Sequence, residues 1–280
     1  LYPLVDDKIK TKQLAKSSGM SVPDLYYTVE REQQLEHLHR ILSLYTDFVI
    51  KPAKGSGGDG VLVISDKRGK KFRKSNGELI TFDDIAYHIS NILGGLYSIG
   101  GHRDKAMIEY RVQFLPLFEK IAYQGVPDIR IIVLKGYPVM AMLRLPTRQS
   151  LGKANLHQGA IGVGIHLKTG MTIDGVHENK KIIEHPDTNE PIAGLQIPDW
   201  QEVLCLAAKC SEMTGLGYLG VDIVLDSQRG PLILEINARP GLSIQVANEQ
   251  GMLPRLEKIE DSGFMHPSLS DKVSFSKENF

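Results

Sequence analysis

A run of glycines between two apolar segments is the feature that most limits how this chain can fold. Residues 48–64 read FVIKPAKGSGGDGVLVI, in which Gly55, Gly57, Gly58 and Gly60 satisfy the spacing G-x-G-x-x-G. A P-loop and a dinucleotide fingerprint both open a helix after their glycines, but VLVI consists of strand formers. The stretch therefore predicts a strand–loop–strand flap whose backbone N–H groups face a phosphate. A plain glycine-rich surface turn has the same pattern.

The residues around and after this loop narrow its interpretation. Lys51, just before the glycines, places a cation beside the loop. Protein kinases use a similar flap, but neither the full H-R-D-x-x-x-x-N motif nor D-F-G follows in this chain. The flap therefore indicates a phosphate-binding device that is neither a protein kinase loop nor a dinucleotide site.

Composition restricts the partners and the setting. The chain has 280 residues with 33 Lys plus Arg and 33 Asp plus Glu, so no global positive field favours nucleic acid. Its two cysteines, Cys205 and Cys210, lie five apart in an expected helix and form no disulfide framework. The N-terminal LYPLVDDKIK lacks the apolar core of a signal peptide, and no apolar run is long enough to span a bilayer. We expect a cytoplasmic protein without nucleic-acid partners.

Hydrophobic periodicity predicts a mixed α+β protein with antiparallel sheets rather than a doubly wound parallel sheet. The expected helices cover 6–18, 31–44, 83–93 and 199–214, and the expected strands and hairpins cover 47–51, 61–64, 107–112, 129–145 and 218–237. A charged turn region is expected over 67–78, a long polar loop over 146–162 and a loose polar tail over 261–280.

A late hairpin, LGVDIVLDSQRGPLILEINARPG, brings two carboxylates together. Pairing its strands about the central turn places Asp222 opposite Glu235, with Asn237 on the same face. Two carboxylates and an amide oxygen are hard ligands, which suit Mg²⁺ bridging phosphates. Alternatively, Arg130 or Arg239 neutralises the carboxylate pair.

Together, the flap and this hairpin resemble those of ATP-grasp enzymes, in particular the ribosomal-protein glutamate ligases and the related alpha-L-glutamate ligase-like proteins. The matching segments are DDKIKTKQLAKSSGMSVP, VIKPAKGSGGDGV, EYRVQF, DIRIIVLKGYPVMAMLR, NLHQGA and GVDIVLDSQRGPLILEINARPG, and they cover the chain from Asp6 to about Leu256. The resemblance implies an ATP-grasp fold in which two α+β subdomains clasp ATP between antiparallel sheets. It implies an N-terminal helical segment of the large subdomain at 1–24, a small lid subdomain with the flap at 25–107, a large subdomain with the metal site at 108–260 and a polar tail at 261–280.

The resemblance also implies roles for individual positions. ATP contacts are implied for Lys8, Lys51, Ser56, Gly57, Gly58, Glu109, Tyr110, Val112 and Asp128, and Mg²⁺, with Mn²⁺ as a substitute, is implied at Asp222, Glu235 and Asn237. Asn155 matches a residue close to the triphosphate and the substrate. The side chains of Arg130, Arg144 and Arg239 can bind a carboxylate or an acylphosphate, because guanidinium groups match planar anions.

The implied activity is ATP- and Mg²⁺-dependent ligation of a carboxylate to an amine through an acylphosphate, adding glutamate or another amino acid. The substrates are then small-molecule or peptide carboxylates and amines. Where the glutamate ligases carry Arg-Ser-Asn, this chain has Lys153-Ala154-Asn155, and Lys153 supplies charge without a bidentate fork. ATP-grasp enzymes usually carry an α/β domain ahead of the segment matching Lys8, so a partner protein or second subunit is expected to complete the substrate site.

Two other functions fit the same residues. One is an ATP-grasp kinase, or a sugar- or cell-envelope-associated transferase, which forms a stable phosphoester instead of an amide. The other is a non-catalytic nucleotide-binding module that regulates a partner.

Overall fold

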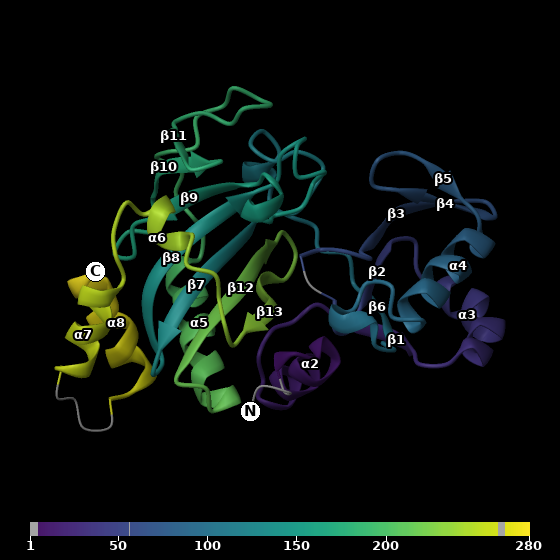
Figure 1. Ribbon diagram of the computed structural model, residues 1–280, viewed down its shortest axis with the longest axis horizontal. Helices are drawn as coiled ribbons and strands as arrows, with labels where there is room; N and C mark the ends of the chain where they lie inside the picture. Colours follow the sequence, from purple (N-terminus) through teal and green to yellow (C-terminus); the bar gives the residue numbers. More distant parts are fainter. Residues whose placement is uncertain (1–4, 56, 263–266) are drawn as a thin grey trace. The chain divides into compact units, whose positions relative to one another are not determined.

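The computed structural model describes residues 5–55, 57–262 and 267–280, and its contacts divide the chain into two units (Figure 1). The small unit comprises Asp7–Lys12 and Pro23–Val112, and the large unit comprises Leu1–Asp6, Gln13–Val22 and Gln113–Phe280. The helix α2 (Lys8–Ser17) therefore begins in a small-unit segment and ends in a large-unit segment. The expected subdomain border after residue 107 would assign Glu109 to the large unit, whereas the contacts group Glu109 with the small one.

The small unit contains a six-stranded antiparallel sheet with the strand order β1-β6-β2-β3-β4-β5. Its strands are β1 (Leu25–Val29), β2 (Phe48–Pro52), β3 (Leu62–Arg68), β4 (Lys71–Lys74), β5 (Leu79–Ile80) and β6 (Ala106–Glu109). Its helices are α3 (Leu35–Leu42) and α4 (Phe82–Leu93), with short 3-10 turns at Glu32–Gln34 and Ile99–Gly101.

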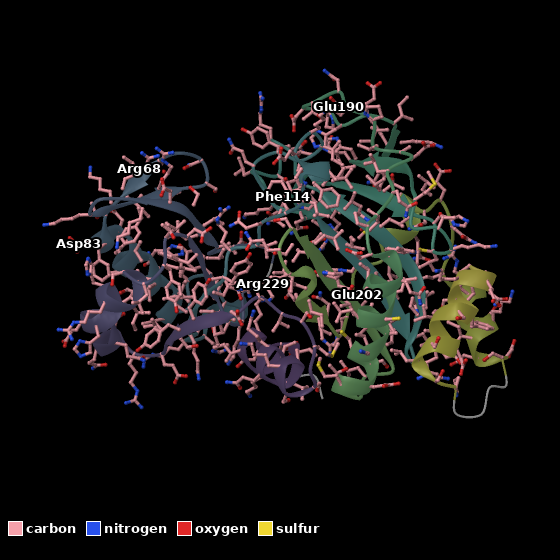
Figure 2. All side chains as sticks on the ribbon, turned by 180° about the vertical axis from the view of Figure 1, so that it is seen from behind. Arg68, Asp83, Phe114, Glu190, Glu202 and Arg229 are labelled. Atoms are coloured by element: carbon pink, nitrogen blue, oxygen red, sulfur yellow. The ribbon has the colours of Figure 1, made fainter. Side chains whose placement is uncertain are left out.

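One apolar core joins this sheet to its helices. Leu38 and Ile89, from α3 and α4, share a buried cluster with Phe48 and Phe72, from β2 and β4. The two phenylalanine rings meet edge to face with centroids 5.9 Å apart. Charged side chains such as Arg68, which Figure 2 labels, are exposed on the outside of this unit. The helical spacing of apolar residues in α3 and α4 thus serves to cover one face of the sheet.

The glycine flap has the predicted strand–loop–strand form. Strand β2 pairs antiparallel with β3, and Ile50 lies opposite Leu62 across the loop. The expected charged turn region over 67–78 is wrong in part, because β3 continues to Arg68 and pairs with β4 around Gly69. Their charged side chains, Asp66, Lys67 and Arg68 on β3 and Lys71, Arg73 and Lys74 on β4, gave no apolar pattern from which a strand could be predicted.

The large unit is built on a seven-stranded antiparallel sheet with the order β11-β10-β9-β8-β7-β12-β13. Its strands are β7 (Asp128–Leu134), β8 (Tyr137–Leu145), β9 (Ile161–Ile165), β10 (Thr172–His177), β11 (Lys180–Ile182), β12 (Tyr218–Asp226) and β13 (Gly230–Asn237). Its helices are α5 (Trp200–Thr214), α6 (Ile244–Ala247), α7 (Leu253–Glu260) and α8 (Leu269–Asn279), with 3-10 turns at Pro116–Phe118 and Leu156–Gln158.

Strand alternation gives the two faces of this sheet different partners. Ile129 and Ile131 of β7 belong to the core that contains α5, whereas Ile132 belongs to a second core with Ile244 of α6. Because successive side chains point to opposite faces, Arg130 lies on the face opposite α5. The same alternation places Asp222 there, since its neighbours Val221 and Ile223 pack in the α5 core.

Two expectations for the large unit need correction. The polar loop expected over 146–162 contains the 3-10 turn Leu156–Gln158 and reaches the start of β9, whose strand was not expected. The loose tail expected over 261–280 includes the helix α8, which a capping box at Ser268 begins. Val273 of α8 is fully buried, so this helix is part of the core.

Candidate functional site

The small unit buries a carboxylate between two lysines. Glu109, at the end of β6, is 2% exposed. Its Oε1 lies 2.5 Å from Nζ of Lys51 on β2, and its Oε2 lies 2.8 Å from Nζ of Lys12 on α2. Burial acts to raise the pKa of Glu109, but the two ammonium groups outweigh it and lower the pKa below the usual value. Lys51 and Glu109 were expected to contact ATP, whereas Lys12 was missed, although it follows Lys8 by one helical turn.

The flap is tied down on both sides of its glycines. Nζ of Lys8 donates a hydrogen bond to the carbonyl oxygen of Gly55, which forms an isolated bridge with Ser98. At the other end, Nε2 of His88 lies 3.0 Å from the carbonyl oxygen of Gly60. Motif spacing could not reveal the His88 contact, because α4 lies far along the chain.

Backbone geometry in the flap agrees with its glycines. Gly57, Gly58 and Gly60 have φ of +65°, +78° and +73°, which other residues rarely adopt. A Cβ at Gly60 would lie 2.6 Å from the ring of Tyr97. Ser56, expected to contact phosphate, lies outside the described residues.

Two further residues with implied ATP contacts, Tyr110 and Val112, closely follow β6. Tyr110 and Val112 are both buried, and the backbone N–H of Tyr110 donates to the carbonyl oxygen of Asp24 at 2.8 Å. Their contact with a nucleotide stays a prediction.

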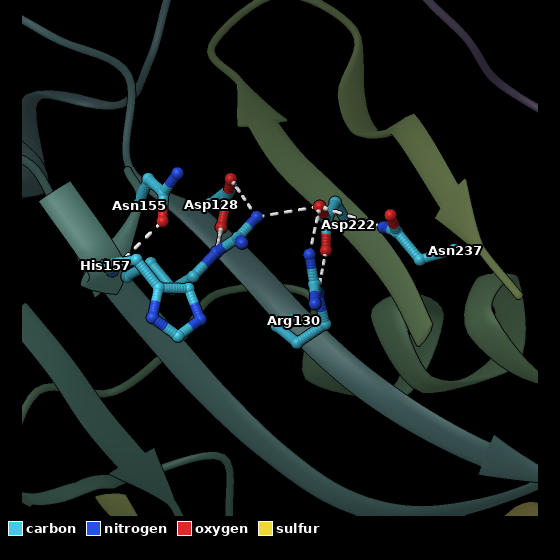
Figure 3. Close-up of polar contacts among 7 residues, drawn as sticks. Asp128, Arg130, Asn155, His157, Asp222 and Asn237 are labelled. Atoms are coloured by element: carbon cyan, nitrogen blue, oxygen red, sulfur yellow. Dashed lines mark hydrogen bonds and ion pairs between the residues drawn. The ribbon is translucent and has the colours of Figure 1, made fainter. Parts of the chain in front are cut away.

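The large unit carries four charged side chains in one chain of ion pairs (Figure 3). Arg130 of β7 donates to both carboxylate oxygens of Asp222 on β12, with Nη2–Oδ2 at 2.7 Å. Arg144 of β8 donates to both oxygens of Asp128, at 2.5 and 2.6 Å, and also to Oδ2 of Asp222 at 2.7 Å. The strand register explains the cluster, because Arg130 lies opposite Asp222 and Asp128 lies opposite Arg144.

The two aspartates of the cluster have different affinities for protons. Burial tends to raise the pKa of Asp222, but Arg130 and Arg144 together lower it to about 2. Burial raises the pKa of Asp128 to about 6, because Arg144 opposes it only in part and the nearby charge of Asp222 adds to it. Asp222 is therefore ionised at neutral pH.

The predicted metal ligands lie together on the last hairpin. Asp222 is opposite Glu235 in the β12–β13 register, as expected, and Nδ2 of Asn237 lies 3.4 Å from Oδ2 of Asp222. Carboxylate and amide oxygens suit Mg²⁺, so the chemistry of the donor set fits this ion. The alternative of arginine neutralisation also has support, since Arg130 pairs with Asp222. Among the described residues, no group of three His, Cys, Asp or Glu side chains is arranged to hold a metal.

The remaining predicted residues lie in loops of the large unit. Oδ1 of Asn155 accepts a hydrogen bond from the backbone N–H of His157 at 3.1 Å and so begins a 3-10 turn (Figure 3). Lys153, just before it, is half-buried, and Arg239, after β13, is exposed. Arg144, on β8, is largely buried between two carboxylates.

No helix in the described ranges is long and apolar enough to cross a bilayer. No curated protein matches the chain.

Among solved structures, the D-cycloserine synthetase DcsG is similar with a TM-score of 0.51 and 15% identity, over 93% of this chain and 71% of that one. The ADP complex of N5-carboxyaminoimidazole ribonucleotide synthetase is similar with a TM-score of 0.51 and 13% identity, over 85% of this chain and 46% of that one. D-alanine–D-alanine ligase from Bacillus anthracis has a TM-score of 0.49 and 14% identity, over 98% of this chain and 66% of that one. The chain thus spans less than two thirds of the length of this ligase.

The match to a family model, together with the likeness to the first two of these structures, confirms the expected ATP-grasp fold with two antiparallel sheets and helices. A family model described as "Sugar-transfer associated ATP-grasp" matches residues 1–261. The chain therefore belongs to the family of sugar-transfer associated ATP-grasp proteins.

Proposed function

We propose that this chain is an ATP- and Mg²⁺-dependent ligase that joins a carboxylate to an amine. The observation that carries the proposal is the ion-pair cluster of Asp128, Arg130, Arg144 and Asp222, which holds two acidic and two basic side chains on one face of a sheet. A cation that binds Asp222 would release guanidinium donors for an anion. The cluster is thus suited to take up a cation and a planar or phosphoryl anion together.

The residues divide into four kinds of role. Phosphate binding belongs to Lys8, Lys51, Gly57 and Gly58, adenine and ribose binding belongs to Glu109, Tyr110 and Val112, and Asp128 is a further acid that contacts the nucleotide. Substrate carboxylate and acylphosphate binding belongs to Arg130, Arg144, Lys153, Asn155 and Arg239. Asp222, Glu235 and Asn237 would hold Mg²⁺, which would stabilise negative charge on the transferring phosphoryl group.

The proposed reaction has two steps. A substrate carboxylate oxygen attacks the γ-phosphorus of ATP, the bond to ADP breaks, and an acylphosphate forms. An amine then attacks the acyl carbon, phosphate leaves, and the amine loses a proton. Arg130 and Arg144 stabilise the anions in both steps, because Asp128 keeps Arg144 in position while the donors that Asp222 releases become available to the anion. The nature of the amino acid, glutamate or another, belongs to this proposal.

A second candidate is phosphoryl transfer to a hydroxyl group of a sugar-like substrate. The description of the matched family as sugar-transfer associated favours it. Such an enzyme would use the same ATP contacts but would release a stable phosphoester.

A substrate screen separates these functions. Pairs of carboxylates and amines, and separately sugars, are incubated with ATP and Mg²⁺, while ADP release and product mass are measured. ADP together with a new amide supports the ligase, and ADP with a phosphoester supports the kinase. ATP binding without ADP under any mixture contradicts both and supports a regulatory module.

The screen needs a variant that tests the assignment of the metal ligands. Glu235→Gln keeps the shape of the side chain and removes its charge, so Mg²⁺-dependent turnover should fall by tenfold or more, about 1.4 kcal/mol. Unchanged turnover and an unchanged Mg²⁺ requirement would show that Glu235 does not hold the metal.

A further inference from the structure

Two lysines contact one buried carboxylate in the small unit. Glu109 lies within 2.8 Å of two ammonium groups, and both lysines are buried, with Lys12 5% and Lys51 7% exposed. A buried carboxylate needs at least one counter-charge, and either ammonium group is close enough to supply it. The geometry therefore allows one lysine to leave Glu109 while the other stays.

The two lysines are held differently. Nζ of Lys12 also donates to the carbonyl oxygen of Pro23, so an oxygen other than the Glu109 carboxylate helps to fix it. Lys12 belongs to α2. The first turn of this helix is fixed by Asp7, whose Oδ1 accepts a hydrogen bond from the backbone N–H of Ile9 at 3.0 Å. Lys51 comes from β2, directly before the flap, and Glu109 is its ion-pair partner in the structure.

We propose that Lys12 is a positioning residue, which keeps Glu109 neutralised when Lys51 leaves it to bind a nucleotide phosphate. This inference rests on the proposed ATP site. Without Lys12, a Lys51 that turned to phosphate would leave a buried carboxylate without a counter-charge, which is strongly unfavourable. Glu109 thus pairs with Lys51 in the free protein. Because Lys12 remains beside Glu109, Lys51 can leave it for the phosphate at a low cost in free energy.

A double-mutant cycle tests this role. The dissociation constant of Mg-ATP is measured by calorimetry for the wild type, Lys12→Met, Glu109→Gln and the double variant. We expect Lys12→Met to weaken ATP binding by about tenfold. In the Glu109→Gln background the same substitution should change binding by less than about twofold, because the carboxylate that needed neutralising is gone.

Two further variants act as controls. Lys12→Arg keeps the charge and should bind ATP within about threefold of the wild type. Lys10→Met removes an exposed lysine from the same helix and should leave binding unchanged. If Lys12→Met does not fold in a thermal unfolding assay, Lys12→Gln replaces it, since glutamine still has a donor for the carbonyl of Pro23.

The outcomes separate this inference from the proposed function. If the wild type does not bind ATP, the proposed function itself is wrong. If the wild type binds ATP but Lys12→Met binds equally well, the inference is overturned. An equal loss in the wild-type and Glu109→Gln backgrounds would also overturn it, because Lys12 would then act without the carboxylate.

Discussion

Asp222 accepts hydrogen bonds from two guanidinium groups, and this double pairing determines what its substitution does. Asp222→Asn would leave Arg130 and Arg144 short of a buried counter-charge. We expect the free energy of unfolding to fall by about 3 to 5 kcal/mol, and ATP turnover to be lost. Denaturant unfolding monitored by circular dichroism measures the first effect.

A surface aspartate supplies the matched control for this substitution. Asp174 pairs with Lys181 at 2.7 Å, but the two side chains are 39% and 54% exposed. Asp174→Asn should cost no more than about 1 kcal/mol. Equal losses for the two variants would mean that the buried cluster contributes no more than a surface pair.

His185 is the residue from which we expect a pH dependence of stability. Its Nε2 lies 3.0 Å from the carbonyl oxygen of Pro146, and its Nδ1 accepts from the backbone N–H of Asp187 at 3.2 Å. Burial lowers the pKa of His185. This effect outweighs the hydrogen bond to Pro146 and the charge of Asp187, which both act to raise the pKa. His185 therefore binds a proton more readily in the unfolded chain than in the folded protein. The contribution of the neutral side chain to the free energy of unfolding is fully present above pH 6.5 and is lost as the pH falls.

The comparison for this prediction is His185→Asn, whose amide has a donor and an acceptor but does not titrate. The wild type should lose more free energy of unfolding than this variant between pH about 7.5 and about 5. Parallel pH profiles for the two proteins would show that His185 does not contribute.

At the scale of the element, the flap depends on close packing of its last glycine. Gly60→Ala combines a positive φ with a Cβ 2.6 Å from the Tyr97 ring. Gly69→Ala has a similar φ of +60° but meets nothing within 4 Å. We expect Gly60→Ala to cost about 2 to 3 kcal/mol of stability and Gly69→Ala about 1 kcal/mol, measured by denaturant unfolding. Similar losses would mean that Tyr97 moves aside.

Elements with a single strong pattern could be predicted from the sequence. The β12–β13 hairpin was predicted with its register, because apolar residues alternate around Asp222 and Glu235 and a short turn joins the strands. The continuation of β3 beyond residue 64, the strand β4 and the strands β9–β11 were missed, since charged residues in the first two and glycines in β9 and β10 interrupt the apolar pattern. The helix α8 was missed because its buried residues are few, although Ser268 followed by Asp271 is a capping signal.

In the candidate site, too, local patterns could be predicted and contacts between distant segments could not. Spacing along the chain was enough to propose Lys51, Asp222 and their neighbours as site residues, since motifs are local. It could not show that Arg144 bridges Asp128 and Asp222, because that contact joins three strands and depends on registers set by the whole sheet. A pairing partner can be inferred only when the strands that carry it have been placed.

At the scale of the whole molecule, the small and large units have separate apolar cores. Phe72 lies in the core of the small unit and is 2% exposed. Phe72→Ala should destabilise that unit by about 3 to 5 kcal/mol. In calorimetry we expect two unfolding transitions, of which this variant lowers only one. One transition that shifts as a whole would show that the two units unfold cooperatively.

The way α2 is shared between the units bears on how the protein is made. Ile9 packs with Ala53 and Met107, so the small unit is completed by residues nearly one hundred positions apart. Since a chain emerges from the ribosome N-terminus first, Ile9 waits without its partner until Met107 has been synthesised. The helix α2 is therefore translated well before the strand β6 that packs against it.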